Sequence, residues 1–343
     1  MKIPAKVTAL SLCLAVPLVF AGSEKVEDLS IWKLPPAPIP ADNPQTAAKI
    51  ALGHRLAFDI RLSKNDSMSC AHCHVPAVGG GGPTPRAFGH GGELGRWAPT
   101  WINSAYYTSL FWDGRASSLE EQTGALPGHM GPISAPGEMA GDVPEIVNKL
   151  NAIPAYKQAF QTAFGSGATP QTIAQAIASF ERTLVADQSP FQKYVNGDTT
   201  SISDAAKRGF EVFRGKGVCT ICHAPPTLTD NKFHNIGVPV AGPLAEDLGH
   251  FDVTKKDSDR GAFKTPSLYN ASSLAFFMHN GAFSRMSQVI AHYNQGGDPK
   301  NPNQSRLIFP LKLSDKEQED LMAFLETLTD KRLDALSAPA DLP

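Results

Sequence analysis

Two copies of the pentapeptide Cys-x-x-Cys-His are the residues of this chain most able to do chemistry. They occupy residues 70–74 and 219–223. At this spacing two thiols can add across the vinyl groups of a haem, and the histidine that follows can ligate its iron. The motifs therefore predict two covalent c-type haems, held by Cys70, Cys73 and His74 and by Cys219, Cys222 and His223.

A Cys-x-x-Cys pair alone would also suit a redox dithiol or half of a zinc site. The chain has 5 cysteines, and the fifth, Cys13, lies in a predicted leader. Every other cysteine belongs to one of the two motifs. A zinc or disulfide interpretation would leave both trailing histidines as coincidences, so the two-haem interpretation is favoured.

Residues 1–21 have the features of a secretory signal peptide. Lys2 and Lys6 form a basic start, an apolar stretch runs to Phe20, and Ala21 provides a small residue for cleavage. The apolar stretch is too short to span a membrane, and we expect no membrane span elsewhere. Export predicts a periplasmic protein in a bacterium, the compartment in which c-type haem is attached.

The remaining sequence predicts a mainly α fold with long loops and few short strands, organised as two cytochrome c-like haem domains. We expect these domains at residues 30–195 and 196–336, with residues 189–200 as a linker. Helix starts are predicted at Asn43, which precedes a proline, at Ser203, and at Ser314, which has Glu317 three residues on. The last of these helices could pack back on the first domain. The net charge of −2 gives no indication of nucleic-acid binding.

Several segments closely resemble the bacterial dihaem cytochrome c peroxidases and the related MauG enzymes of methylamine utilisation. The resemblance extends from about Ala48 to Leu328, with the motifs in family order around both haem sites. The segments are 88–91 (FGHG), 111–115 (FWDGR), 118–122 (SLEEQ), 263–268 (FKTPSL) and 278–281 (MHNG).

The resemblance implies that the N-terminal haem reacts with hydrogen peroxide and that the C-terminal haem transfers electrons. Glu138 matches the family carboxylate that moves a proton between the peroxide oxygens, and Gln122 matches the glutamine of the pocket. Trp112 matches the tryptophan that lies between the haems and can relay an electron. Without the family context, these residues would be a loop carboxylate, a helix-surface amide and a core tryptophan. The stretch between Gln122 and Glu138 is longer than is usual in the family.

His90 matches the displaceable histidine that blocks the peroxidatic iron of the peroxidases in the resting state. MauG-type enzymes leave this iron open. His90 is flanked by glycines, and it could equally be a surface loop residue. The resemblance therefore names His90 as a resting-state distal ligand without excluding a plain surface position.

Tyr293 is the residue that distinguishes the two branches of the family. It lies 14 residues after His279, where the peroxidases carry a methionine iron ligand and the MauG-type enzymes carry tyrosine. A phenolate favours more oxidised iron than a thioether does. The resemblance thus implies Tyr293 as the distal ligand of the second haem, and the alternatives are His292, Met286 and Met278.

A calcium ion between the haems is a further expectation from the family. Its usual asparagine ligand is replaced here, since Trp97 stands near that position and Leu274 and Phe276 occupy the other two ligand positions. Main-chain carbonyls and water could still bind Ca²⁺, so the ion stays an open expectation.

The sequence favours a MauG-like dihaem enzyme. Hydrogen peroxide would produce a high-valent two-haem state that oxidises an aromatic residue of a periplasmic partner protein at a distance. One alternative is a cytochrome c peroxidase that receives electrons from a small cytochrome or copper protein. The other is a dihaem electron carrier with no enzymatic activity. A monomer and a homodimer are both compatible with the sequence.

Overall fold

The computed structural model describes Met1, residues 28–244 and residues 246–343, so the predicted signal peptide lies outside the described residues apart from Met1. The fold is mainly helical with short strands, as the sequence predicted. Among the described residues, no helix combines the length and the apolar character that crossing a membrane requires.

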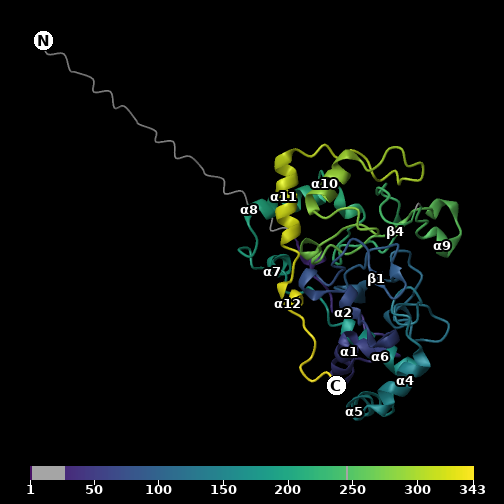
Figure 1. The fold of residues 1–343 in the computed structure, drawn as a ribbon. Coiled ribbons are helices and arrows are strands. Elements are labelled where there is room, and N and C mark those ends of the chain that lie inside the picture. The colour runs from purple at the N-terminus through teal and green to yellow at the C-terminus, as the bar shows by residue number, and fades with distance from the viewer. Residues whose placement is uncertain (2–27, 245) are drawn as a thin grey trace.

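The helices of the first half are α1 (Ala47–Phe58), α2 (Cys70–Cys73), α3 (Leu119–Gln122), α4 (Val143–Ala152), α5 (Pro154–Phe164) and α6 (Pro170–Glu181). Those of the second half are α7 (Pro190–Val195), α8 (Asp204–Arg214), α9 (Phe251–Thr254), α10 (Met286–Gln295), α11 (Asp315–Glu326) and α12 (Lys331–Asp334). Two antiparallel strand pairs join β1 (Phe88–Gly89) to β2 (Gly92–Glu93) and β3 (Phe233–His234) to β4 (Phe263–Lys264). Figure 1 shows the helices near the start of the chain, such as α1, α4, α5 and α6, at one end of the molecule and α8, α10 and α11 at the other, with α7 and α12 between them.

Each half is built around one closely packed helix pair, α1 with α6 and α8 with α11. A glycine makes each close approach possible. A Cβ atom at Gly53 would lie 1.9 Å from the carbonyl oxygen of Ala176, and one at Gly209 would lie 1.8 Å from that of Asp320. The chain then runs from α1 and from α8 into the two Cys-x-x-Cys-His segments, so these pairs position both motifs.

Side-chain caps fix the starts of these helices. Ser203 and Ser314 accept hydrogen bonds from the backbone of α8 and α11, as predicted. The predicted start at Asn43 is wrong, because α1 begins at Ala47 and Thr46 caps it. The Asn43 side chain instead donates to Glu120 Oε1, at 2.7 Å. The same carboxylate forms a buried ion pair with Arg182, so Asn43 belongs to a polar cluster with residues distant in the sequence.

The core of the second half also includes residues that come before it in the chain. Trp32 lies edge-on to Phe210 at 4.7 Å between ring centres. Phe191 of α7 packs against Phe324 of α11 at 5.2 Å. The expected linker therefore begins with a buried helix. The domain limits of 30–195 and 196–336 stay a prediction.

The end of the chain returns to the first half, as Figure 1 shows for the segment that follows α12. The last long helix, α11, packs on α8, whereas α12 lies against the turn at Pro76–Val78. The carbonyl of Ser337 is 2.8 Å from Nε2 of His54 on α1. These contacts join the two halves, and the contact of α12 lies directly after the first Cys-x-x-Cys-His motif.

Candidate active site

The first Cys-x-x-Cys-His motif opens onto a cavity of about 580 Å³. Helix α2 carries both cysteines, and His74 follows directly after its end. Cavities of this size commonly bind small molecules and cofactors. The structure brings Gln122, from the end of α3, and Glu138, from a loop, into the same cavity. The lining residues that matter here are Cys70, Cys73, His74, Gln122, Glu138 and Trp112.

The orientation of His74 fits a proximal iron ligand. Its Nδ1 lies 2.9 Å from the carbonyl oxygen of Pro99. A carbonyl can only accept a hydrogen bond, so Nδ1 carries the proton and Nε2 keeps its lone pair for a metal. Burial lowers the pKa of His74 and keeps the ring neutral. The His74 ring is therefore held in the neutral tautomer that can ligate iron through Nε2.

The second motif repeats this arrangement in a cavity of about 360 Å³. Nδ1 of His223 lies 3.0 Å from the carbonyl oxygen of Leu228, which again leaves Nε2 for iron. Burial lowers the pKa of His223. Tyr293, on α10, lines the same cavity together with Cys219 and Cys222. Burial raises the pKa of the Tyr293 phenol, so the hydroxyl is protonated in the absence of a metal.

The thiols also fit covalent attachment to haem. All four cysteines are free, and none of them forms a disulfide within the described part of the chain. Burial raises the pKa of Cys70 and of Cys219 to about 12, which keeps both as neutral thiols. The cavities, the thiols and the histidines suit two c-type haems.

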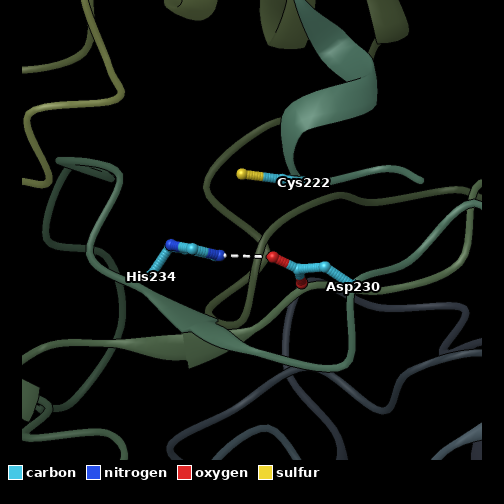
Figure 2. A group of neighbouring side chains, drawn as sticks. All are labelled: Cys222, Asp230 and His234. Atoms are coloured by element: carbon cyan, nitrogen blue, oxygen red, sulfur yellow. Dashed lines mark hydrogen bonds and ion pairs between the residues drawn. The ribbon is translucent and has the colours of Figure 1, made fainter.

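One group beside the second cavity has the spacing of a metal site (Figure 2), and two of its members, Cys222 and His234, line that cavity. The ligand atoms of Cys222, Asp230 and His234 lie within 4.8 Å of one another. His234 Nε2 is 2.8 Å from an oxygen of Asp230. Burial raises the pKa of Asp230, but hydrogen bonds led by that of His234 outweigh it, and the net pKa lies below the usual value. Cys222 cannot form a thioether bond to haem and ligate a zinc ion at the same time. We therefore interpret Asp230 and His234 as a hydrogen-bonded pair that packs beside the haem attachment site.

Glu138 has the environment of a proton-transfer group. Burial raises its pKa, and the nearby Arg115 guanidinium opposes this only in part. Arg115 Nη2 lies 3.9 Å from Glu138 Oε1. A carboxyl group with a raised pKa exchanges protons more readily near neutral pH than an ordinary surface carboxylate does. Glu138 and Gln122 thus place a proton-exchanging group and an amide in the cavity of His74.

Trp112 lies in the wall that the two cavities share, since it lines both of them. Its Nε1 donates to the carbonyl of Trp97 at 2.9 Å, which fixes the plane of the indole. The ring of His279 meets it edge-on at 6.5 Å, and that of Trp97 is at the same distance. The structure therefore places a rigid aromatic side chain between the two predicted haem sites.

Two charged residues at or beside this wall were not anticipated from the sequence, and Arg96 lines the first cavity only. Arg96 bonds to Asp113, at 2.6 Å, and to both oxygens of Asp247, at 2.7 Å each. Lys264 of β4 lines both cavities, and burial lowers its pKa to about 7. Its Nζ lies 3.1 Å from the centre of the Tyr107 ring. The FKTPSL segment contained Lys264, but burial of the ammonium could not be deduced from sequence.

The structure does not bring His90 into the first cavity. The residue lies in the turn between β1 and β2, where its side chain is exposed, and it is absent from the cavity lining. Its backbone N–H donates to the carbonyl of Glu138 at 2.6 Å. Ligation of iron by His90 stays a prediction, and it would require this hairpin to rearrange.

Among the alternatives to Tyr293, Met278 and Met286 also line the second cavity. His292 does not, and its Nε2 lies 2.9 Å from the carbonyl oxygen of Ile236. The calcium ion likewise stays a prediction. Trp97, which stands near the position of the family's asparagine ligand, donates its Nε1–H to the carbonyl of Gly82 at 3.0 Å.

Two cavities, each with paired thiols and a histidine whose Nε2 is free for iron, define a dihaem c-type protein. The family model described as di-haem cytochrome c peroxidase matches residues 47–200. The chain is 37% identical to the cytochrome-c peroxidase IdrP1 of Pseudomonas sp. (strain SCT), covering 95% of this chain and 92% of that protein. It is 41% identical to the methylamine utilization protein MauG of Methylorubrum extorquens, covering 85% and 81% of the two chains.

A solved structure of a MauG-like protein associated with microbial copper homeostasis has the same fold. Its TM-score is 0.78 at 31% identity, over 88% of this chain and 95% of that one. The chain belongs to the di-haem cytochrome c peroxidase family, which includes MauG. It is a haem-dependent oxidoreductase that acts with peroxide and carries two c-type haems. The expected alternative of a non-enzymatic carrier is not supported.

Proposed function

We propose that this chain is a MauG-like enzyme, in which hydrogen peroxide oxidises the two-haem protein by two electrons and the protein then oxidises a partner protein at a distance. The observation that carries the proposal is the position of Tyr293 in the cavity of Cys219, Cys222 and His223. A phenolate ligand stabilises the more oxidised states of iron, whereas a methionine ligand raises the reduction potential. The second haem would thus store an oxidising equivalent.

When bound, the haem at His74 supplies an iron at which peroxide is cleaved, and the protein supplies the proton transfer. Glu138 accepts a proton from the near oxygen of peroxide and returns it to the far oxygen, which leaves as water. The amide of Gln122 holds the peroxide in position by hydrogen bonding. Arg115 keeps part of the negative charge on Glu138 compensated, so the carboxylate can form in a buried site.

Trp112 connects the two sites. Because its indole lines both cavities and is fixed by a hydrogen bond to Trp97, an electron can pass from the second haem to the first without rearrangement of the protein. The substrate that we propose is an aromatic side chain of an exported partner protein, and the compartment is the periplasm. The exposed position of His90 supports a first haem that is open to peroxide in the resting state.

A second candidate function is that of a cytochrome c peroxidase, favoured by relatives that carry this name. Its electrons would come from a small cytochrome or copper protein, and His90 would block the first haem until the second is reduced. Stopped-flow spectroscopy separates the two. The fully oxidised and the half-reduced proteins are mixed with hydrogen peroxide, and the Soret change is followed. We expect the fully oxidised and the half-reduced proteins to react with hydrogen peroxide at comparable rates. A fully oxidised protein that reacts only after reduction would establish the peroxidase instead.

A further inference from the structure

A second tryptophan, Trp101, lies against the proximal histidine of the first haem site. Its ring is stacked on that of His74, with 5.6 Å between the ring centres and 15° between the planes. The side chain is 4% exposed and lines the first cavity, but it does not line the second. Trp101 therefore lies on the proximal-histidine side of the first haem site, whereas Trp112 lies in the wall between the two haem sites.

The surroundings of Trp101 hold the indole in this stack. Phe180 packs edge-on at 5.9 Å and Phe58 lies at 6.3 Å. A Cβ atom at Gly80 would lie 2.5 Å from both Nε1 and Cδ1 of the indole, so the backbone covers this edge closely. His74 is itself fixed by its bond to Pro99. Neither ring can turn away without disturbing the packing of α1 against α6.

The geometry points to Trp101 as a redox-active residue that donates one electron, through the stacked His74, to the oxidised first haem when no substrate protein is present. Hydrogen peroxide is the oxidant. It would take two electrons from the haem pair, and its far oxygen would leave as water when the O–O bond breaks. The near oxygen would leave as a second water, with two protons from solvent, once the first site is reduced again. Trp101 then returns one of these electrons to the first haem and becomes an indole cation radical, while the second haem keeps the remaining oxidising equivalent. This inference rests on the proposed function.

The same electron transfer determines the lifetime of the oxidised haem pair in the absence of substrate. A hole on a buried ring between Phe58 and Phe180 is shielded from solvent, so Trp101 would divert an oxidising equivalent that could otherwise damage the haem or its ligands. The price of this protection is a shorter lifetime of the oxidised haem pair. Substitution of Trp101 should therefore lengthen that lifetime and increase damage from repeated peroxide additions.

The test compares wild type with Trp101→Phe, which keeps an aromatic ring in the stack but is far harder to oxidise. The matched control is Trp32→Phe, since Trp32 is equally buried, at 5% exposure, and lies outside both cavities. One equivalent of peroxide is added to the haem-loaded protein without substrate. The Soret spectrum gives the extent of formation and the rate of decay of the oxidised state.

We expect all three proteins to form the oxidised state to the same extent, and the decay to slow several-fold in Trp101→Phe alone. An unchanged decay rate in Trp101→Phe would overturn the inference while leaving the proposed function intact. If no protein forms the state until it is half-reduced, the proposed function fails, and the same decay comparison on the half-reduced proteins still decides the role of Trp101.

An isotope experiment gives an answer even if Trp101→Phe fails to take up haem. Wild type, Trp32→Phe, Trp97→Phe and Trp112→Phe are labelled with ring-deuterated tryptophan and frozen during the decay. We expect an electron paramagnetic resonance signal that narrows on deuteration in every one of these proteins that forms the oxidised state. A signal that is absent, insensitive to the label, or lost when any of these three other tryptophans is replaced would contradict the assignment to Trp101.

Discussion

Replacement of Glu138 by glutamine should remove the proton-transfer group while preserving the shape of the first cavity. General acid–base groups typically contribute about 10²–10⁴-fold to a rate. At about 1.36 kcal/mol for each factor of ten, this corresponds to about 3–5 kcal/mol of activation free energy. We therefore expect Glu138→Gln to slow the reaction of the oxidised protein with peroxide by this factor, without loss of either haem.

The pH dependence gives the sharper signature. The carboxylate form of Glu138 must accept the peroxide proton, and burial raises the pKa of Glu138. The wild-type rate should therefore fall as the pH drops through this raised pKa, and the fall should be absent in Glu138→Gln. Because Arg115 holds the pKa of Glu138 down, Arg115→Gln should move the fall to higher pH.

Stopped-flow measurement of the Soret change against peroxide concentration, at several pH values, tests this reasoning. Glu121→Gln is the matched control. The Glu121 and Glu138 side chains are each 27% exposed, but Glu121 bonds to Ser117 and does not line the cavity. A Glu138→Gln rate within a factor of about two of wild type, or an equal loss in Glu121→Gln, would refute the role of Glu138.

Three further outcomes are expected. Gly209→Ala should destabilise the protein by about 1–3 kcal/mol, measured by denaturant unfolding, because the new methyl group would overlap the Asp320 carbonyl. Burial raises the pKa of Glu181 to about 8, so between about pH 5 and 8 the folded state binds a proton that the unfolded state has lost. The free energy of unfolding should therefore fall by up to about 1.4 kcal/mol per pH unit over this range. Glu181→Gln should flatten this pH dependence. Tyr293→Met should raise the reduction potential of one haem by on the order of 0.1 V, within the roughly 0.8 V range that axial ligands set. Spectroelectrochemistry measures this potential, and an unchanged value would show that Tyr293 is not a ligand.

The haem sites could be predicted from sequence because covalent attachment requires two thiols and a histidine within five adjacent residues. The helix starts at Ser203 and Ser314 were also predictable, since a cap depends on local bonds. The helix start predicted at Asn43 is wrong because the Asn43 side chain bonds to Glu120, which is distant in sequence. No local pattern carries that information.

The other site residues come from loops that the fold brings together. Gln122, Glu138 and Trp112 were identified only through resemblance to a family, because nothing in their spacing indicates a common cavity. Arg96 and Lys264 were missed, although Lys264 lines both cavities and Arg96 lines the first. Their significance depends on burial, and burial of a cation follows from tertiary packing that single-sequence reasoning does not reach.

The most direct test of the account is the oxidation state of both irons after one equivalent of hydrogen peroxide. The fully oxidised protein, enriched in ⁵⁷Fe, is mixed with peroxide without reductant or substrate, frozen within the first phase, and measured by Mössbauer spectroscopy. We expect both irons to be oxidised beyond the ferric state, since Trp112 and Tyr293 would allow the second haem to hold one oxidising equivalent. Two unchanged ferric irons, or a change confined to one iron, would contradict it.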